Sequence, residues 1–219
     1  MTLLLTSGGI DESFQELFLS LLSKPPKDIS VAYITTAAFG EDQSGDMAWT
    51  NFARDDLKRV GITNIQDIDI RGKKEKELFS LLSQKDIILV NGGNTFYLLK
   101  YARETGFDTV IKQLVSNGKL YIGVSAGSYI TCPTIQHAYW KYPDRNVVDL
   151  TDLTGFNFVP FLLVAHFTEE IRSDVEQEAK KVPYPVVALV DTQAVLVTDT
   201  TVKIIGGGKK EFYNGFIEK

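Results

Sequence analysis

Short apolar runs alternate with longer amphipathic segments along most of the chain. This alternation is typical of a mostly parallel β-sheet that is covered by helices on both faces. The apolar runs predict strands over residues 2–5, 29–34, 64–70, 86–90, 120–124 and 161–165. The amphipathic segments between them predict helices over residues 12–22, 47–60, 74–82, 95–105 and 108–116.

The segment 47–60 has large apolar residues at helical spacing, namely Trp49, Phe52, Ala53, Leu57 and Val60. A stripe of this kind marks the face of a surface helix that packs on the core. We therefore expect these residues to be buried in the core rather than to line a ligand site.

Beyond Pro185 the apolar runs become short and closely spaced, at residues 186–189, 194–198 and 202–205. A parallel pair of strands needs a crossover of about a dozen residues or more, so these runs predict antiparallel strands. The chain is thus predicted to be an α/β protein, a three-layer α/β/α sandwich whose mostly parallel sheet has an antiparallel C-terminal edge. We expect one domain over residues 1–219, because about 200 residues is an ordinary length for such a domain.

Composition and charge limit the classes of function that we expect for this chain. The 219 residues carry a net charge of −5 with acidic and basic residues interspersed, so they offer no basic stripe for nucleic acid. No apolar stretch approaches the ~20 residues that span a bilayer, and the first residues lack the basic start of a signal peptide. The single cysteine, Cys132, cannot form an intramolecular disulfide. We expect a cytoplasmic protein that binds neither nucleic acid nor a membrane.

The strongest chemical signal is the sequence Gly123-Val124-Ser125-Ala126-Gly127, which directly follows an apolar strand. A G-x-S-x-G turn between a strand and a helix raises the serine hydroxyl out of the sheet, so Ser125 is a candidate nucleophile. An alternative interpretation remains, in which the glycines only allow close helix packing and Ser125 caps the helix.

Other polar and glycine-rich turns follow predicted strands at the same edge of the sheet, where ligands of open α/β folds bind. They are Ser7-Gly8-Gly9 and Asn91-Gly92-Gly93-Asn94. A serine nucleophile needs a base, and the chain has two histidines. His166 directly follows the apolar run 161–165 and is the favoured base, whereas His137 is expected in a loop.

For the carboxylate that orients the histidine, Asp191 is favoured because it follows the run 186–190, with Asp144 as the second choice. Acyl transfer also requires donors for the oxyanion, usually the backbone N–H after the nucleophile and one from a glycine turn. These donors would be Ala126 and Gly93. We assign Asn94 to substrate binding.

Three stretches together resemble the serine peptidases of family S51, the group of peptidase E (an aspartyl dipeptidase) and cyanophycinase. The stretches are Asn91-Gly92-Gly93-Asn94-Thr95-Phe96-x-Leu98-Leu99, Asn117-Gly118-x-Leu120-Tyr121-Ile122-Gly123-x-Ser125-Ala126-Gly127 and Cys132-Pro133-Thr134-Ile135. The resemblance implies a class I glutamine amidotransferase-like (flavodoxin-like) fold, with serine in place of the amidotransferase cysteine and no metal or organic cofactor.

The resemblance also implies roles for individual residues. It places the nucleophile on Ser125 and the base on His166. For the orienting carboxylate the family offers two positions. One falls on Trp140, which cannot serve, and the other falls on Asp191. Where the aspartyl dipeptidases have a segment resembling G-E-T-R after the histidine, this chain has Phe167-Thr168-Glu169-Glu170-Ile171-Arg172. The resemblance thus offers Arg172 as a substrate-binding residue, and the alternative is an ordinary arginine on a helix surface.

We therefore predict a serine peptidase, dipeptidase-like, that hydrolyses short peptides through a Ser-His-Asp acyl-enzyme mechanism. N-terminal Asp-X dipeptides are the substrates that the resemblance implies. Two alternatives stay open: an isoaspartyl or cyanophycin-type peptidase, and a noncatalytic α/β module that holds an anion with its glycine turns. The expected partner is a small peptide substrate, and a homodimer is compatible with the sequence.

Overall fold

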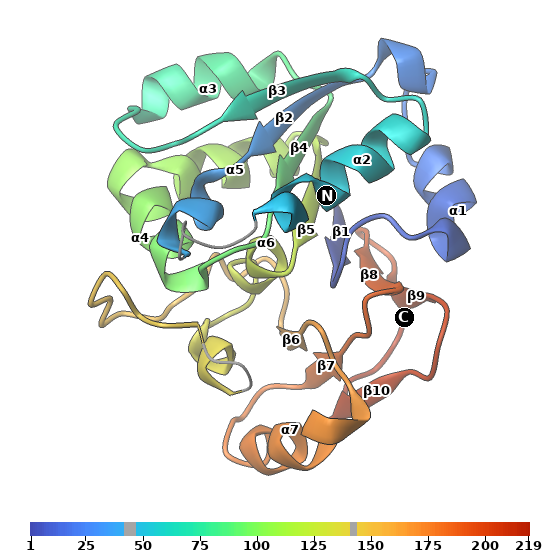
Figure 1. Ribbon diagram of the computed structural model, residues 1–219, viewed down its shortest axis with the longest axis vertical. Helices are drawn as coiled ribbons and strands as arrows, with labels where there is room; N and C mark the ends of the chain where they lie inside the picture. Colours follow the sequence, from blue (N-terminus) through green and yellow to red (C-terminus); the bar gives the residue numbers. More distant parts are fainter. Residues whose placement is uncertain (42–46, 141–143) are drawn as a thin grey trace.

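The computed structural model describes residues 1–41, 47–140 and 144–219. Its main sheet has seven strands in the order β3-β2-β4-β5-β1-β8-β9. Figure 1 shows this sheet running through the upper part of the molecule. Its strands are β1 (Thr2–Thr6), β2 (Ser30–Ile34), β3 (Asn64–Ile68), β4 (Ile87–Val90), β5 (Leu120–Val124), β8 (Gln193–Val197) and β9 (Val202–Gly206).

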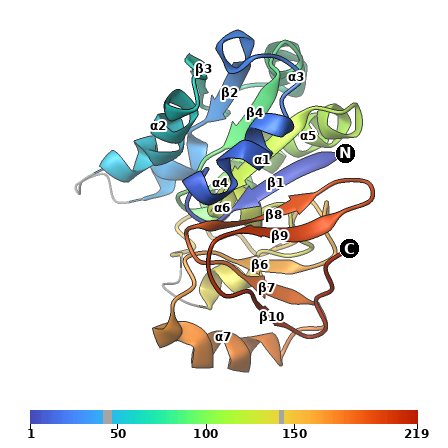
Figure 2. The same ribbon diagram turned by 90° about the vertical axis from the view of Figure 1, so that its right-hand side faces the viewer.

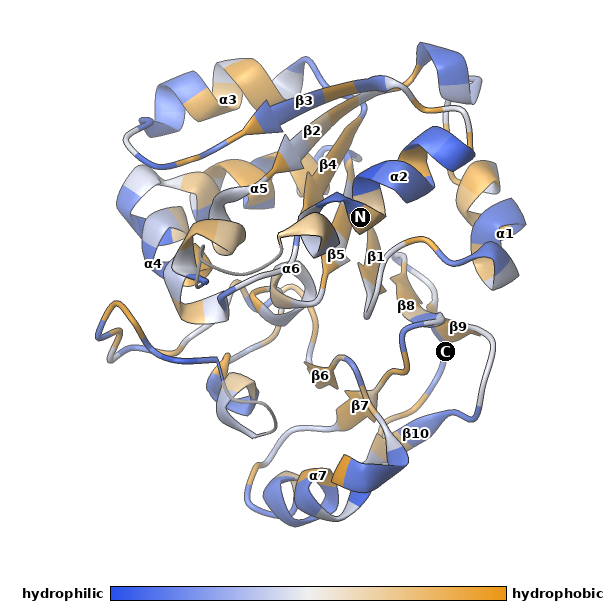
Figure 3. Cartoon of the chain, in the orientation of Figure 1, coloured by the Kyte–Doolittle hydropathy of each residue, from blue (hydrophilic) through white to orange (hydrophobic). Residues whose placement is uncertain are grey.

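Strands β1 to β5 are parallel to one another, and β8 and β9 add an antiparallel edge next to β1. Strands β4 and β5 are buried along their whole length, as expected for strands covered on both faces. Figure 3 shows that the central strands are hydrophobic, whereas the helices around them carry both hydrophilic and hydrophobic residues. The predicted parallel sheet with an antiparallel edge is confirmed.

Helices cover both faces of the main sheet. They are α1 (Gln15–Ser20), α2 (Phe52–Arg59), α3 (Glu75–Ser83), α4 (Thr95–Thr105), α5 (Phe107–Ser116) and α6 (Ala126–Tyr129). Side chains alternate along a strand, so neighbours on β1 face opposite layers. Leu4 packs in one core with Phe18 of α1, whereas Leu5 packs in the other with Phe96 of α4. The predicted three-layer α/β/α sandwich is confirmed.

A second sheet of three strands lies below the main sheet in Figure 2. Its strands are β6 (Leu162–Val164), β7 (Val186–Ala188) and β10 (Glu211–Tyr213). Strand β7 pairs in parallel with β6 and antiparallel with β10, so the prediction that the run 186–189 pairs with its neighbours in the main sheet was wrong. Helix α7 (Arg172–Ala179) supplies the crossover that a parallel pair requires.

The stripe predicted over residues 47–60 divides between core and surface. Ala53, Leu57 and Val60 are buried as expected, but the prediction was wrong for Trp49, which is half-buried, and for Phe52, which is 62% exposed. The physical reason is that residues Ala48–Asn51 form a 3₁₀ turn before α2. Because this turn has about three residues per turn, Trp49 does not continue the buried face of α2. Phe52 is the first residue of α2 and directly precedes buried Ala53, so its side chain is turned about 100° away from the buried face.

Candidate active site

Ser125 lies in a tight turn between β5 and α6, with φ 48° and ψ −107°. A positive φ is uncommon for a residue other than glycine, and such strain is concentrated at functional sites. A Cβ atom on Gly127 would lie 2.0 Å from the carbonyl oxygen of Val90, so glycine is required for α6 to approach β4 this closely. The Ser125 side chain makes no capping hydrogen bond to α6, which does not support the helix-cap alternative.

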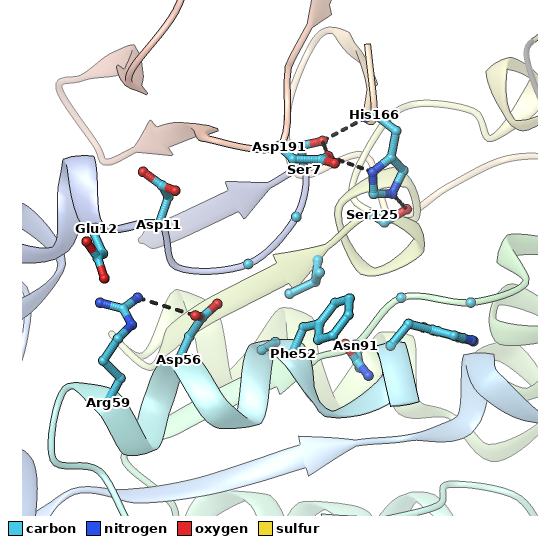
Figure 4. Close-up of a pocket in the computed structure, with 17 residues that line it drawn as sticks. Ser7, Asp11, Glu12, Phe52, Asp56, Arg59, Asn91, Ser125, His166 and Asp191 are labelled. Atoms are coloured by element: carbon cyan, nitrogen blue, oxygen red, sulfur yellow. Dashed lines mark hydrogen bonds and ion pairs between the residues drawn. The ribbon is translucent and has the colours of Figure 1, made fainter. Parts of the chain in front are cut away.

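The structure brings Ser125, His166 and Asp191 together. His166 follows β6 and Asp191 follows β7, so both come from the second sheet. The Nε2 atom of His166 lies 3.1 Å from the Ser125 Oγ, and its Nδ1 atom lies 2.6 Å from the Asp191 Oδ1 (Figure 4). A carboxylate only accepts hydrogen bonds, so the Nδ1–H donates to Asp191 and Nε2 is left to accept from the serine hydroxyl.

Ser7, at the end of β1, joins this arrangement to the main sheet. Its hydroxyl donates to the Asp191 Oδ1 at 2.8 Å and accepts from the backbone N–H of His166 at 2.7 Å. Ser7 is fully buried, and His166 has a positive φ of 55°. Sequence reasoning treated residues 7–9 only as a glycine turn at the rim. Their position after an apolar strand was the available signal, but the partners of Ser7 are 159 and 184 residues away.

Gly93 and Ala126, the two predicted oxyanion donors, lie before and after Ser125 in the sequence, and both are close to it in the structure. Gly93 lines the cavity in front of Ser125 and has φ 130°, where a Cβ atom would lie 2.5 Å from the Ala37 carbonyl carbon. Ala126 is the first residue of α6, so its N–H has no partner within the helix. Within the described ranges, neither backbone N–H donates a hydrogen bond. Among the described residues, no acceptor therefore competes for these two donors.

A cavity of about 640 Å³ extends from Ser125 to helix α2. His166, Asp191 and Ser7 line it near the serine, and Figure 4 shows Phe52 below them on α2. This volume is in the range of pockets that bind small organic molecules, about 300–1,000 Å³. Where the chain is described, no group of three or more His, Cys, Asp and Glu side chains is arranged to hold a metal ion.

The structure does not bring the two predicted substrate-binding residues to this cavity. Asn94 caps α4, because its Oδ1 accepts from the Tyr97 N–H at 3.0 Å and its Nδ2 donates to the Arg145 carbonyl at 2.9 Å. The Arg172 guanidinium forms ion pairs with Glu169 at 2.6 Å and Glu211 at 2.5 Å. Both side chains are thus engaged in holding the fold together.

Asp144, the second choice for the orienting carboxylate, lines a small recess beside Ser125 and His166. Its Oδ2 accepts from the Thr95 N–H at 2.7 Å. Burial raises the pKa of Asp144, and hydrogen bonds from Thr95 oppose the increase. The carboxylate that bonds the Nδ1 atom of His166 is that of Asp191.

His137, the second candidate base, is buried under the end of β6. Its ring centroid lies 4.4 Å from that of Tyr129, whose hydroxyl accepts from the Ala165 N–H at 3.0 Å. Burial lowers the pKa of His137 from an ordinary 6.5 to about 3. It therefore packs beneath the strand that carries His166. It is not among the residues that line the cavity.

No helix in the described part of the chain is both long enough and apolar enough to cross a membrane.

Comparisons with known proteins agree with this geometry. A model of peptidase family S51 matches residues 3–205. An uncharacterized peptidase of Pasteurella multocida is 32% identical over 189 residues, which cover 83% of this chain and 86% of that protein. Peptidase E of Escherichia coli is 36% identical over 100 residues, which cover 46% of this chain and 42% of that protein.

Solved structures give the same assignment. A candidate peptidase E of Listeria monocytogenes superposes with a TM-score of 0.79 and 26% identity, covering 94% of this chain and 98% of that one. A peptidase from an acI-B1 actinobacterium shares the fold, with a TM-score of 0.67 and 17% identity over 100% of this chain and 96% of that one. The chain therefore belongs to peptidase family S51, and with it to the serine peptidases.

Proposed function

We propose that this protein hydrolyses short peptides through a covalent acyl-enzyme, with Ser125 as nucleophile, His166 as general base and acid, and Asp191 as the orienting carboxylate. The observation that carries the proposal is the unbroken series of contacts from Asp191 through both ring nitrogens of His166 to the Ser125 Oγ. A serine hydroxyl is a weak nucleophile at neutral pH, and this arrangement supplies the base that activates it.

The first half of the reaction forms the acyl-enzyme. The Ser125 hydroxyl proton moves to the His166 Nε2 while the Oγ attacks the carbonyl carbon of the scissile bond. The N–H groups of Gly93 and Ala126 bind the resulting oxyanion, a contribution worth about 3 kcal/mol for each donor. The carbon–nitrogen bond then breaks, and the leaving amine takes the proton from Nε2.

The second half releases the acyl group. A water molecule donates a proton to Nε2 and its oxygen attacks the acyl carbon, after which the ester bond breaks and the proton returns to the Ser125 Oγ. Asp191 keeps the imidazole in the tautomer that can accept at Nε2 and stabilises the imidazolium that forms twice in each cycle. Ser7 positions both groups, because its hydroxyl contacts the Asp191 carboxylate and the His166 backbone.

Short peptides fit the shape of the site. Asp56 and Arg59 also line the cavity and form an ion pair, with the Asp56 Oδ1 and the guanidinium 3.3 Å apart (Figure 4). The Asp56 Oδ2 also accepts from the Ile10 N–H at 2.9 Å, which ties α2 to the loop after β1. A cavity of about 640 Å³ is in the range that holds small organic molecules, which suits a substrate of a few residues.

The test is hydrolysis of a mixture of dipeptides and tripeptides, followed by mass spectrometry of the products. We expect turnover by the wild type and a loss of at least about 10³-fold in kcat for Ser125→Ala and for His166→Ala. Both variants should keep the circular dichroism of the wild type. Undiminished hydrolysis by either folded variant would contradict the assigned roles, and binding without any turnover would favour the noncatalytic module.

A further inference from the structure

The wall of the cavity opposite the catalytic serine is aromatic. Phe52 is 62% exposed, and its ring projects from α2 toward the turn that carries Ser125 (Figure 4). Trp49 also lines the cavity. A large exposed aromatic side chain inside a concave site costs solvation free energy unless something apolar covers it. The exposed Phe52 ring is therefore available to contact an apolar group of a ligand.

The segment that carries the two aromatic residues is held firmly in place. The carbonyl oxygen of Thr50, which lies between them in sequence, accepts from the Tyr33 hydroxyl at 2.8 Å and from the Asn91 Nδ2 at 2.9 Å. Both donors belong to the main sheet region and are buried. Trp49 and Phe52 thus form a preformed surface, which reduces the entropy lost when a ligand binds.

The charges around the cavity are mostly negative. The acidic residues that line it are Asp11, Glu12, Asp56 and Asp191. Among the described lining residues Arg59 is the sole cation, and its guanidinium already contacts the Asp56 carboxylate, the Gln15 side-chain oxygen and the Ile10 carbonyl. An acidic substrate side chain would therefore meet negative potential with no free counter-charge.

From this wall and this charge we infer that the site selects peptides with an apolar side chain next to the scissile bond, seated on Phe52 and Trp49, and disfavours acidic ones. The inference rests on the proposed function, because Ser125 and Phe52 line the same cavity. It differs from the Asp-X preference that the family resemblance implies. It agrees with the position of Arg172, which is paired with Glu169 and Glu211 outside the cavity.

The experiment compares kcat/KM for two dipeptide series, X-Ala and Ala-X, with Phe, Leu, Ala or Asp at X. In one of the series we expect the wild type to prefer Phe and Leu over Asp by about tenfold or more, the effect of covering roughly one aromatic side chain. Phe52→Ala should reduce the ratio of Phe to Ala peptides about tenfold, mainly through KM, and Phe52→Leu should restore part of it.

The matched control is Phe212→Ala. Phe212 is 50% exposed on β10 and does not line the cavity, so its substitution should leave the peptide preference unchanged. Equal or better cleavage of Asp peptides, or an equal loss on all peptides in Phe52→Ala, would overturn the inference. A change in oligomeric state in Phe52→Ala without a change in preference would also overturn it, and would assign the wall to an interface between copies.

Binding separates this inference from the proposed mechanism. The same peptides are titrated calorimetrically into Ser125→Ala and into the double variant Ser125→Ala/Phe52→Ala. Tighter binding of Phe than of Asp peptides, lost in the double variant, supports the apolar site even if no peptide is turned over, a result that would contradict only the proposed function. No preference in binding, together with Ser125-dependent hydrolysis, would leave the mechanism standing and refute the apolar site.

Discussion

The two sheets contribute differently to the active site. The main sheet places Ser125 at the end of β5, a five-residue strand that is buried throughout. The second sheet places His166 and Asp191 after three-residue strands, and their side chains are 52% and 63% exposed. The nucleophile thus follows a long strand of a seven-stranded sheet, whereas its two partners follow short buried strands of a three-stranded sheet and have exposed side chains.

This difference shows that activity depends on how the sheets meet. The strained turn at Ser125 is held by close packing of Gly127 against β4. The positions of His166 and Asp191 are instead fixed by Ser7, which reaches across from β1. Substitutions at residues of the main sheet should therefore change the rate of the chemical step or the stability of the fold. Substitutions at residues of the second sheet should change the position of the His166 ring.

The largest effect after loss of Ser125 or His166 is expected for Asp191→Asn. The amide keeps the shape but loses the charge that fixes the imidazole tautomer and stabilises the imidazolium. We expect kcat to fall on the order of 10³-fold, with unfolding temperature nearly unchanged because the carboxylate is exposed. Steady-state kinetics on a cleaved dipeptide measures this. A variant with near wild-type kcat would show that Asp191 does not orient the base.

The dependence of folding stability on pH tests whether His137 is buried as a neutral ring beneath the second sheet. Its folded-state pKa is about 3, against about 6.5 in the unfolded chain. As pH falls below about 6.5 the unfolded chain binds a proton that the folded protein excludes until about pH 3, so stability is lost across that window by about 1.4 kcal/mol per pH unit. Urea unfolding at pH 7, 6 and 5 measures this loss of stability. In His137→Phe the loss should be smaller, by the amount that the binding of one proton to the unfolded chain accounts for. An unchanged slope would contradict the burial of a neutral ring.

Ser7→Ala tests the junction itself. The substitution removes the donor to Asp191 and leaves the His166 backbone N–H without its acceptor. We expect kcat to fall about tenfold while KM changes little, because the variant loses one or two hydrogen bonds that position the base and the carboxylate.

Ser128→Ala is the matched control for Ser7→Ala, because its buried hydroxyl donates to the carbonyls of Thr6 and Gly123 in the main-sheet region. It should lower stability more than kcat. If the two serine variants had the same kinetic and thermal profiles, Ser7 would have a structural role alone.

The smallest effect on activity is expected for Arg172→Met. Arg172 holds Glu211 of β10 and Glu169, and does not line the cavity. The variant should unfold at a lower temperature and keep the peptide preference of the wild type. A selective loss of acidic peptides in this variant would restore Arg172 as a substrate contact.

The parts of the molecule that sequence could predict depend on local patterns. Helix α4 begins and ends where its amphipathic spacing does, at Thr95 and Thr105, because Asn94 caps one end and Gly106 the other. The turn at Ser125 was also identifiable, since glycine spacing after a buried strand reports a local geometry. The same holds for Asp191, which follows a strand at the rim.

The parts that sequence could not predict depend on pairing between distant segments. Nothing local to the run 186–189 tells whether it joins β8 or leaves for a second sheet, because strand pairing is decided by the whole chain. Phe52 fits the apolar stripe in the sequence, but it begins α2 one position before buried Ala53 and lines the cavity instead. Ser7 acquires its role from partners that follow β6 and β7.

The central claim is that Ser125 and His166, from two different sheets, form one activated nucleophile. Intact-protein mass spectrometry after exposure to a small fluorophosphonate, with peptide mapping, tests it without knowledge of the substrate. The account predicts one adduct per chain, located on Ser125, and no adduct on the His166→Ala variant under the same conditions. An unlabelled wild type, or equal labelling of the folded His166→Ala variant, would contradict it.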